Sequence, residues 1–261
     1  MAHKLYENYY LSNEVEDALN SHLDLARFVT VDNTLVGHAG MKRIINRYSA
    51  TGEAEELAMG KGNSGSIEVT YVPVEYTIKL VQIKFAYFDE QEMEDPMVVP
   101  VGMNKAGAIL FNKMNADIFA EYNKTENIVN ATALDFDAFV DACAKLNLED
   151  LEGVQKFAFV CPLDVAELRK NMKDTLQYVQ AFAVNGYVGH VGDVAIYTKK
   201  DAVKGEVIVA TKEAVTLFNK KGVETEQDRE KNTRENLIYS RKYYFVALTD
   251  ETKAVKIKVT A

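Results

Sequence analysis

One long helical pattern in the middle of the chain constrains the fold most. Asp95-Pro96 is a helix-start signal, and Pro100 is tolerable only if the regular helix begins about there. Apolar residues then recur every three or four positions, as on one helix face: Gly107, Phe111, Met114, Ile118 and Tyr122. We therefore predict a helix from Val101 to about Asn123, a rod of roughly 34 Å.

The residues before this helix have a β pattern. Met41–Tyr48 is a possible strand, and Ile67–Tyr71 and Glu75–Phe88 are rich in β-branched and aromatic residues. The glycine-rich stretch Gly60–Gly65 lies between the first of these runs and the other two. We predict an extended β-hairpin with few partners in its own chain, which indicates a neighbouring subunit.

The first residues read as a polar, partly helical arm. Val29–Asp32 follows as a short strand. The apolar stripe of the arm is too thin for a core of its own and consists of Leu19, Leu23, Leu25 and Phe28. We predict that the arm packs on something else.

Alternating helices and strands follow the long helix. Asp135 can cap a helix whose apolar face ends at Leu146, and Pro162 opens another helix. A third, short helix is predicted over Thr211–Asn219, with Gly222 as its C-terminal stop. The remaining segments read as extended and are Lys156–Cys161, Val194–Thr198, Glu206–Ala210, Val223–Arg229, Leu237–Leu248 and Ala254–Val259.

Composition excludes several classes of protein. The 261 residues carry a formal net charge of −9, so the chain is a poor candidate for wrapping nucleic acid. No apolar run approaches the ~20 residues of a membrane span, and the first residues lack a signal-peptide core. Cys143 and Cys161 have no CxxC partner and read as buried free thiols of a reducing compartment.

The sequence motifs do not indicate catalysis. Gly60–Gly65 formally matches GxGxxG, but it leads into a β run and not into the helix that a dinucleotide site requires. His38 and His190 are isolated, and no hydrolase or protease signature is present. We predict no enzyme activity, no catalytic residue, no metal site and no cofactor.

The order of these elements resembles that of the tailed-phage major capsid proteins, the Hong Kong 97-type fold. The stretch from Gly186 to Ile196 looks like the family's glycine-containing lead into an axial-domain strand. Gly205–Ala210 with Ala214–Phe218 looks like its strand and short helix, and Val223–Arg229 is similar to its acidic strand. Ile238–Tyr244, leading to Val255–Ile257, looks like the closing strands.

The resemblance implies an α+β, Hong Kong 97-like capsid fold with an N-terminal arm, an extended hairpin (the E-loop), a peripheral domain with a long spine helix, and an α/β axial domain. The implied boundaries are 1–36 for the arm, 37–88 for the hairpin and start of the peripheral domain, 89–129 for the peripheral domain with the spine helix, 130–236 for the axial domain, and 237–261 for the closing peripheral strands.

The implied function is that of a major capsid protein. Hexamers and pentamers of the chain would form an icosahedral shell around the double-stranded DNA of a tailed phage or prophage, without sequence-specific binding and without a membrane. The implied partners are other copies, a separate scaffolding protein and a portal, with a decoration protein as a further option. The shell would assemble in the cytoplasm of the bacterial host and form the virion capsid.

The candidate inter-subunit residues lie around the predicted hairpin tip. We expect Lys61 and Asn63 at the tip itself, and we expect Glu53, Glu55 and Glu56 to meet basic groups of a neighbour. One branch of the family cross-links a hairpin lysine to a distant asparagine. The turn Thr249–Thr252 has no asparagine, so we predict no cross-link.

Three alternatives remain at the level of sequence. The first is an encapsulin, a protein nanocompartment of the same fold that packages cargo enzymes. The second is a phage tube or another structural protein. The third is an enzyme with an unrecognised site, which a pocket holding strongly perturbed carboxylates would support.

Overall fold

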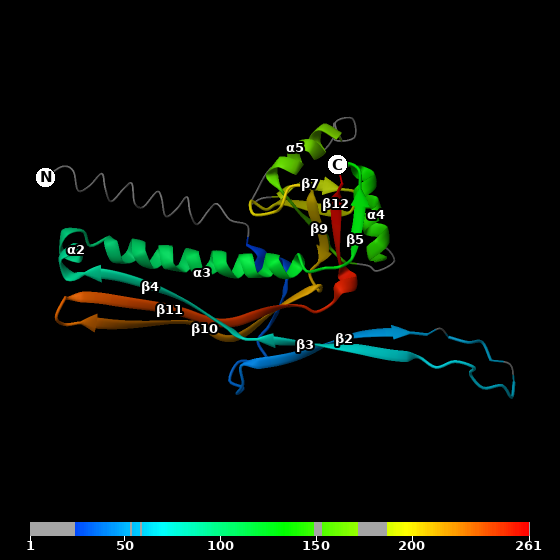
Figure 1. Ribbon diagram of the computed structural model, residues 1–261, viewed down its shortest axis with the longest axis horizontal. Coiled ribbons are helices and arrows are strands. Elements are labelled where there is room, and N and C mark those ends of the chain that lie inside the picture. Colours follow the sequence, from blue (N-terminus) through cyan, green and yellow to red (C-terminus); the bar gives the residue numbers. More distant parts are fainter. Residues whose placement is uncertain (1–23, 53, 58, 149–152, 172–186, 261) are drawn as a thin grey trace.

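The computed structural model describes residues 24–52, 54–57, 59–148, 153–171 and 187–260. The described chain forms a six-stranded sheet with its helices, a four-stranded sheet lying along one long helix, and a two-stranded hairpin that projects away from both (Figure 1). No helix in these ranges is long and apolar enough to cross a membrane.

The six-stranded sheet is covered on both faces. Its strand order is β5-β12-β9-β6-β8-β7, with bounds Ile128–Ala131, Ala254–Val259, Glu206–Thr211, Lys156–Val160, Val194–Thr198 and Tyr187–Val191. Ala158 and Val160 pack in one apolar cluster with helices α4 (Phe136–Leu146) and α5 (Pro162–Asn171). Phe157 and Phe159, on the opposite face, pack against α3. Because side chains alternate along a strand, β6 is buried along its whole length.

The long helix is present as predicted, with slightly different ends. Helix α3 spans Val98–Tyr122, so Pro100 lies in the first turn, where its missing N–H is tolerated. Asp95 does not cap α3 directly, because Met97 is the N-cap, but the Asp95 carboxylate accepts a hydrogen bond from the Met97 N–H at 3.0 Å. The short helix α2 (Asp89–Glu94) precedes it.

Helix α3 lies along a four-stranded sheet of order β1-β10-β11-β4 (Figure 1). The strands are β1 (Thr30–Asp32), β10 (Val215–Glu230), β11 (Glu235–Leu248) and β4 (Lys79–Phe88). Alternate residues of β4 face the helix and are the less exposed ones: Val81, Ile83, Phe85 and Tyr87. The 3-10 helix η1 (Leu25–Phe28) buries Leu25 beside the C-terminal half of α3.

The hairpin consists of β2 (Lys42–Thr51) and β3 (Glu68–Thr77), which pair only with each other in a two-stranded sheet. The predicted run Glu75–Phe88 is therefore two strands in different sheets. Ile78, which is 4% exposed, marks the break between them. The second hairpin strand ends at Thr77, and β4 pairs with β11.

The predicted short helix over Thr211–Asn219 is wrong. Thr211 ends β9, a turn follows, and Val215 begins the 16-residue strand β10, so Gly222 lies inside a strand. Residues 214–218 are all buried in the sheet core. The segment therefore lacks the alternation of apolar and polar residues by which a half-buried strand is identified in a sequence. β10 pairs with β11 from Val215 onward, so this sheet already includes residues well before 237.

Other local predictions are confirmed. The Asp135 carboxylate caps α4 by accepting a hydrogen bond from the Ala138 N–H at 3.0 Å, and Asn147 ends that helix in the left-handed region at φ 49°. Strands occupy Val194–Thr198 and Ala254–Val259 as predicted. Leu19 and Leu23 of the predicted arm stripe lie outside the described residues.

Candidate functional site

We call the four-stranded and six-stranded sheets, with their helices, the body of the molecule. One face of the hairpin is anchored to this body at the base of the hairpin. Ile45 and Tyr76 pack on a small core cluster that contains Phe218 and Phe245. The Tyr76 ring stacks on the Phe245 ring with 5.6 Å between centroids, and Phe245 stacks on Phe218 at 4.7 Å. This aromatic stack fixes the direction in which the hairpin leaves the body.

Arg47 adds a polar anchor from the same strand. Its Nε donates to the carbonyl oxygen of Leu248 at 3.2 Å, and its Nη1 lies 3.4 Å from a carboxylate oxygen of Glu251. Its Nη2 donates to the Tyr76 hydroxyl at 3.4 Å. The guanidinium therefore ties β2 to the turn after β11.

The opposite face of the hairpin is open to solvent and carries several exposed apolar side chains, interrupted by Asn46 and by the Lys42–Glu75 ion pair. Directly paired residues of an antiparallel ladder share a face, and here Tyr48 pairs with Tyr71 and Ala50 with Val69. The two tyrosine rings lie 6.1 Å apart and are 69% and 61% exposed. Ile44 extends this face toward the base of the hairpin and is also exposed. We call Ile44, Tyr48, Val69 and Tyr71 the open face of the hairpin.

The predicted tip residues lie in the loop between the two strands. Glu56, Lys61 and Asn63 are exposed there, while Glu53 lies outside the described residues. Glu55 is bound within the loop, because its carboxylate accepts hydrogen bonds from the Ser64 hydroxyl at 2.6 Å and from the Gly65 N–H at 3.0 Å. Bonds from Ser64 hold the pKa of the Glu55 carboxyl below its ordinary value. A contact of these residues with a neighbour stays a prediction.

Sequence reasoning missed the open face as a candidate site. Both faces of β3 carry apolar side chains, with Val69 and Tyr71 on one face and Val72 and Val74 on the other. The choice between them depends on Phe245, which is distant in sequence. The pairing of two tyrosines could have been found only with the register of the hairpin in hand.

A buried charged network holds α3 against the four-stranded sheet. The Asp117 carboxylate accepts hydrogen bonds from Lys113 Nζ at 2.8 Å and from the Tyr244 hydroxyl at 2.9 Å, and Lys79 Nζ lies 3.7 Å away. Burial acts to raise the pKa of Asp117, but these partners outweigh it and the pKa lies below its ordinary value. Burial and the bond to Asp117 raise the pKa of Tyr244.

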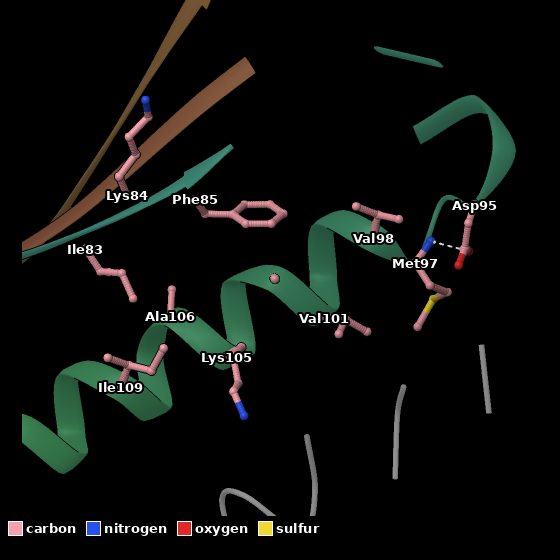
Figure 2. A pocket seen from close by; sticks show the side chains of 11 residues that line it. Ile83, Lys84, Phe85, Asp95, Met97, Val98, Val101, Lys105, Ala106 and Ile109 are labelled. Carbon is pink, nitrogen blue, oxygen red and sulfur yellow. Dashed lines mark hydrogen bonds between the residues drawn. The ribbon is translucent and has the colours of Figure 1, made fainter. Parts of the chain in front are cut away.

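A groove of about 410 Å³ lies between β4 and the N-terminal half of α3. Figure 2 shows Phe85 of β4 reaching over the helix backbone, with Val98, Val101 and Ile109 around the opening. The ring of Phe85 lies directly on Gly102, where a Cβ atom would come within 2.2 Å of it. Lys84 and Lys105 also line this otherwise largely apolar groove, and Figure 2 shows their side chains pointing in opposite directions, away from the space between the strand and the helix.

Within the described ranges, no group of three or more His, Cys, Asp or Glu side chains could hold a metal ion. Cys143 and Cys161 are both buried and are not joined in a disulfide. His38 and His190 lie on different parts of the fold, the first before β2 and the second in β7.

Comparison with known proteins finds phage capsid proteins and an encapsulin. No family model matches the chain. A curated relative is the "Major capsid protein" of Staphylococcus phage phiMR11, which is 29% identical over 255 residues, covering 95% of this chain and 91% of the relative.

Solved structures share the fold at low identity. The capsid of Ralstonia phage GP4 has a TM-score of 0.68 at 10% identity, over 90% of this chain and 88% of that one. The capsid of cyanophage P-SCSP1u has a TM-score of 0.67 at 11% identity, over 91% and 88%. An encapsulin from Synechococcus elongatus also has a TM-score of 0.68, at 9% identity, over 90% and 86%.

Proposed function

We infer that this chain, which has the Hong Kong 97-type fold of the tailed-phage capsid proteins, is a phage major capsid protein that builds an icosahedral shell. The observation that carries this conclusion is the relative named a major capsid protein, which matches along nearly the whole of both chains. The fold shared with solved phage capsids agrees with it.

The hairpin gives this function a physical basis. An isolated two-stranded sheet is marginally stable in water, and this one has an open face of four exposed apolar side chains. Several large apolar side chains exposed on one face of a sheet indicate a protein partner. In a shell, that partner is another copy of the chain, whose own hairpin extends to the next copy in turn. Such head-to-tail contacts close into rings, as hexamers and pentamers require.

The finer assignments are proposals that follow from the resemblance. We assign β4, α3 and β11 to the peripheral domain and the six-stranded sheet with α4 and α5 to the axial domain, which meets its copies at the capsomer centre. This departs from the boundaries implied by the sequence, which placed all of 237–261 in the peripheral domain, because β12 (Ala254–Val259) lies in the six-stranded sheet. A separate scaffolding protein, a portal and a decoration protein are proposed as partners, and the host cytoplasm as the site of assembly. No catalytic role is proposed for any residue.

Charge supports a shell that confines DNA without adhering to it. The net charge of −9 disfavours the phosphate neutralisation on which tight nucleic-acid binding depends. The enclosed double-stranded DNA would therefore be held by the closed wall and not by a binding site.

The encapsulin alternative rests on one observation, the TM-score of 0.68 with an encapsulin, which equals the TM-score with the capsid of Ralstonia phage GP4. Structures at such low identity establish the fold and not the cargo. The sequence relative favours the phage reading.

Electron microscopy of the full chain, produced with its phage's other head proteins, tests the proposal. We expect closed shells that protect double-stranded DNA from nuclease. Shells that enclose a protein cargo and no DNA would support the encapsulin alternative. A chain that stays monomeric in the presence of these partners would contradict both.

A further inference from the structure

One side of helix α3 carries positive charge and no exposed negative charge. Lys105 and Lys113 are exposed and lie about 80° apart around the helix axis, because each residue turns an α-helix by about 100°. The other exposed side chains within this arc are uncharged and are those of Ile109, Ala116 and Ala120. Figure 2 shows Lys105 pointing away from the four-stranded sheet, so this side of the helix is its outer side.

The two carboxylates of α3 are buried, and lysines outnumber them. Asp117 and Glu121 are 8% and 7% exposed. One Asp117 oxygen lies 2.8 Å from Lys113 Nζ and 3.7 Å from Lys79 Nζ, and Glu121 pairs with Lys124 at 2.5 Å. These three lysine side chains nevertheless remain more than half exposed. We call Lys79, Lys105, Lys113 and Lys124 the lysine row. With the two carboxylates its formal charge is 4 − 2 = +2.

The face of the four-stranded sheet away from α3 has the opposite charge. Lys84 lies there, because it follows Ile83 and precedes Phe85, and both of these neighbours face α3. The paired residues of this face include three cations, Lys84, Lys221 and Arg241, and five carboxylates, Glu224, Glu226, Asp228, Glu230 and Glu235. Their formal charge is 3 − 5 = −2. The sheet with its helix is therefore positive on one side and negative on the other.

Duplex DNA fits a row of lysines better than a small anion does. From Lys105 to Tyr122, at its end, α3 rises by roughly 25 Å. A duplex carries one negative charge per about 1.7 Å of its axis, so a duplex lying along α3 presents phosphates to the whole row. A single carboxylate or phosphate would meet only one or two of the lysines. The small side chains of Ala116 and Ala120 leave room for such a bulky ligand between the lysines.

We propose that the lysine row contacts phosphates of the enclosed duplex DNA, so that the side of the four-stranded sheet that carries α3 forms the inner surface of the shell. This proposal rests on the proposed function, which places DNA on one side of the wall only. The contacts are independent of base sequence. They number about four per copy and are weakened by salt, so the closed wall still provides the confinement.

Acetylation of lysines in intact shells tests the proposal. Shells filled with DNA are compared with shells from which the DNA has been released and digested, and mass spectrometry reports the rate at each lysine. We expect Lys105 to react at least about three-fold more slowly in filled shells, because a neighbouring phosphate favours the charged, unreactive amine. Lys84 is the matched control, since it is exposed on the other side of the sheet and should react equally in both.

Salt separates a phosphate contact from simple exclusion of the reagent. Raising the salt of filled shells to about 0.5 M should restore the Lys105 rate of emptied shells, because phosphate contacts are salt-dependent. Protection of Lys105 that persists at this salt concentration would contradict the proposal. Equally slow reaction of Lys105 in filled and emptied shells would also contradict it, since a protein surface would then cover the row.

Binding by the unassembled full chain provides an independent readout. The probe is a fluorescent duplex of about 30 base pairs, titrated at several salt concentrations from about 20 mM upward. Lys105→Gln should reduce the slope of log K against log salt by about 0.9, the value for one phosphate contact. Lys84→Gln should leave the slope unchanged. Equal slopes for the two variants would overturn the proposal.

Failure of this proposal can be distinguished from failure of the proposed function. A chain that forms no shells, or shells without DNA, would contradict the proposed function. Shells filled with DNA in which Lys105 reacts as fast as in emptied shells would contradict the lysine row alone.

Discussion

The six-stranded sheet and the hairpin are built from similar residues but differ in what covers them. Strand β6 of the sheet is buried at all five positions, with helices on both faces. In the hairpin, aromatic and β-branched side chains of the same kind are 57% to 69% exposed at Val69, Tyr71 and Tyr48. The comparison teaches that the body contains its own core, whereas the hairpin has only the base of one face covered and, in the proposed shell, depends on a neighbouring copy to bury the other face.

The largest effect on stability is expected in the body. Phe159 is fully buried and contacts the rings of Phe119, Phe157 and Tyr122. Phe159→Ala should lower the free energy of unfolding by about 3–5 kcal/mol, because it leaves a cavity in the packed core. Urea denaturation of the unassembled chain measures this. A loss below about 1 kcal/mol would contradict the claim that the body is complete by itself.

The next effect is expected in the hairpin and should appear only on assembly. Replacing both Tyr48 and Tyr71 by Ser should weaken subunit association by about 30-fold or more, since buried aromatic anchors contribute about 2 kcal/mol or more. The yield of shells, measured by sedimentation, reports this. Urea denaturation of the unassembled chain should change by less than about 0.5 kcal/mol.

Val72→Ser is the matched control for this pair, because Val72 is 64% exposed on the other face of the same strand. If the control blocked assembly as strongly as the tyrosine variant, the assignment of the open face would be wrong.

A pair of glycine substitutions in α3 sharpens the comparison within the body. At Gly102 a Cβ would lie 2.2–2.7 Å from the Phe85 ring, so Gly102→Ala should destabilise the chain by about 1–3 kcal/mol. At Gly107 nothing lies within 4 Å, so Gly107→Ala should stabilise it by up to about 1 kcal/mol. Thermal unfolding measures both, and shifts of the same sign would contradict the described packing.

The Asp117 network predicts a pH dependence that belongs to the body alone. The folded pKa of Asp117 lies below the ordinary value of 3.8, so its contribution to stability is present above pH 3.8 and is lost as the pH falls through the folded value. Asp117→Asn should lower stability at neutral pH by roughly 1.5–3 kcal/mol, because charged hydrogen bonds are lost. Urea midpoints from about pH 6 to pH 2 should fall less steeply in the variant. Parallel profiles would show that Asp117 does not provide this dependence.

The smallest effect is expected at the hairpin tip. Glu56 is exposed, and we expect Glu56→Lys to lower the yield of shells a few-fold at low salt, because exposed ion pairs contribute about 0.2–1 kcal/mol. Glu56→Gln should have about half that effect, since it removes the charge without reversing it. An unchanged yield with Glu56→Lys would remove this residue from the proposed interface.

The parts of the fold that the sequence predicted are those with local signals. The spacing that ends at Tyr122 predicted α3, although Gly107, which was predicted on the apolar face of that helix, is exposed. Asp135 predicted the start of α4. The break at Ile78 was missed because both strands are rich in β-branched residues, and only their distant partners β2 and β11 separate them. The helix predicted over Thr211–Asn219 failed because burial on both faces leaves no alternation to identify a strand.

For the candidate site, too, the sequence predicted only the part that has a local signal. A glycine-rich loop between two β runs predicted where Lys61 and Asn63 lie, because loop composition is a local signal. The sequence could not show that Glu55 binds Ser64 inside the loop, nor which hairpin face stays open. Both depend on contacts between residues whose register is set only by the folded chain.

Amide hydrogen exchange of the chain before and after assembly tests the central claim most directly. We expect the amides of β2 and β3 to exchange rapidly in the unassembled chain and to become protected in the shell, while those of β6 and β9 are protected in both. Equal protection of β2 and β3 before and after assembly would contradict the claim that a neighbouring copy completes the hairpin.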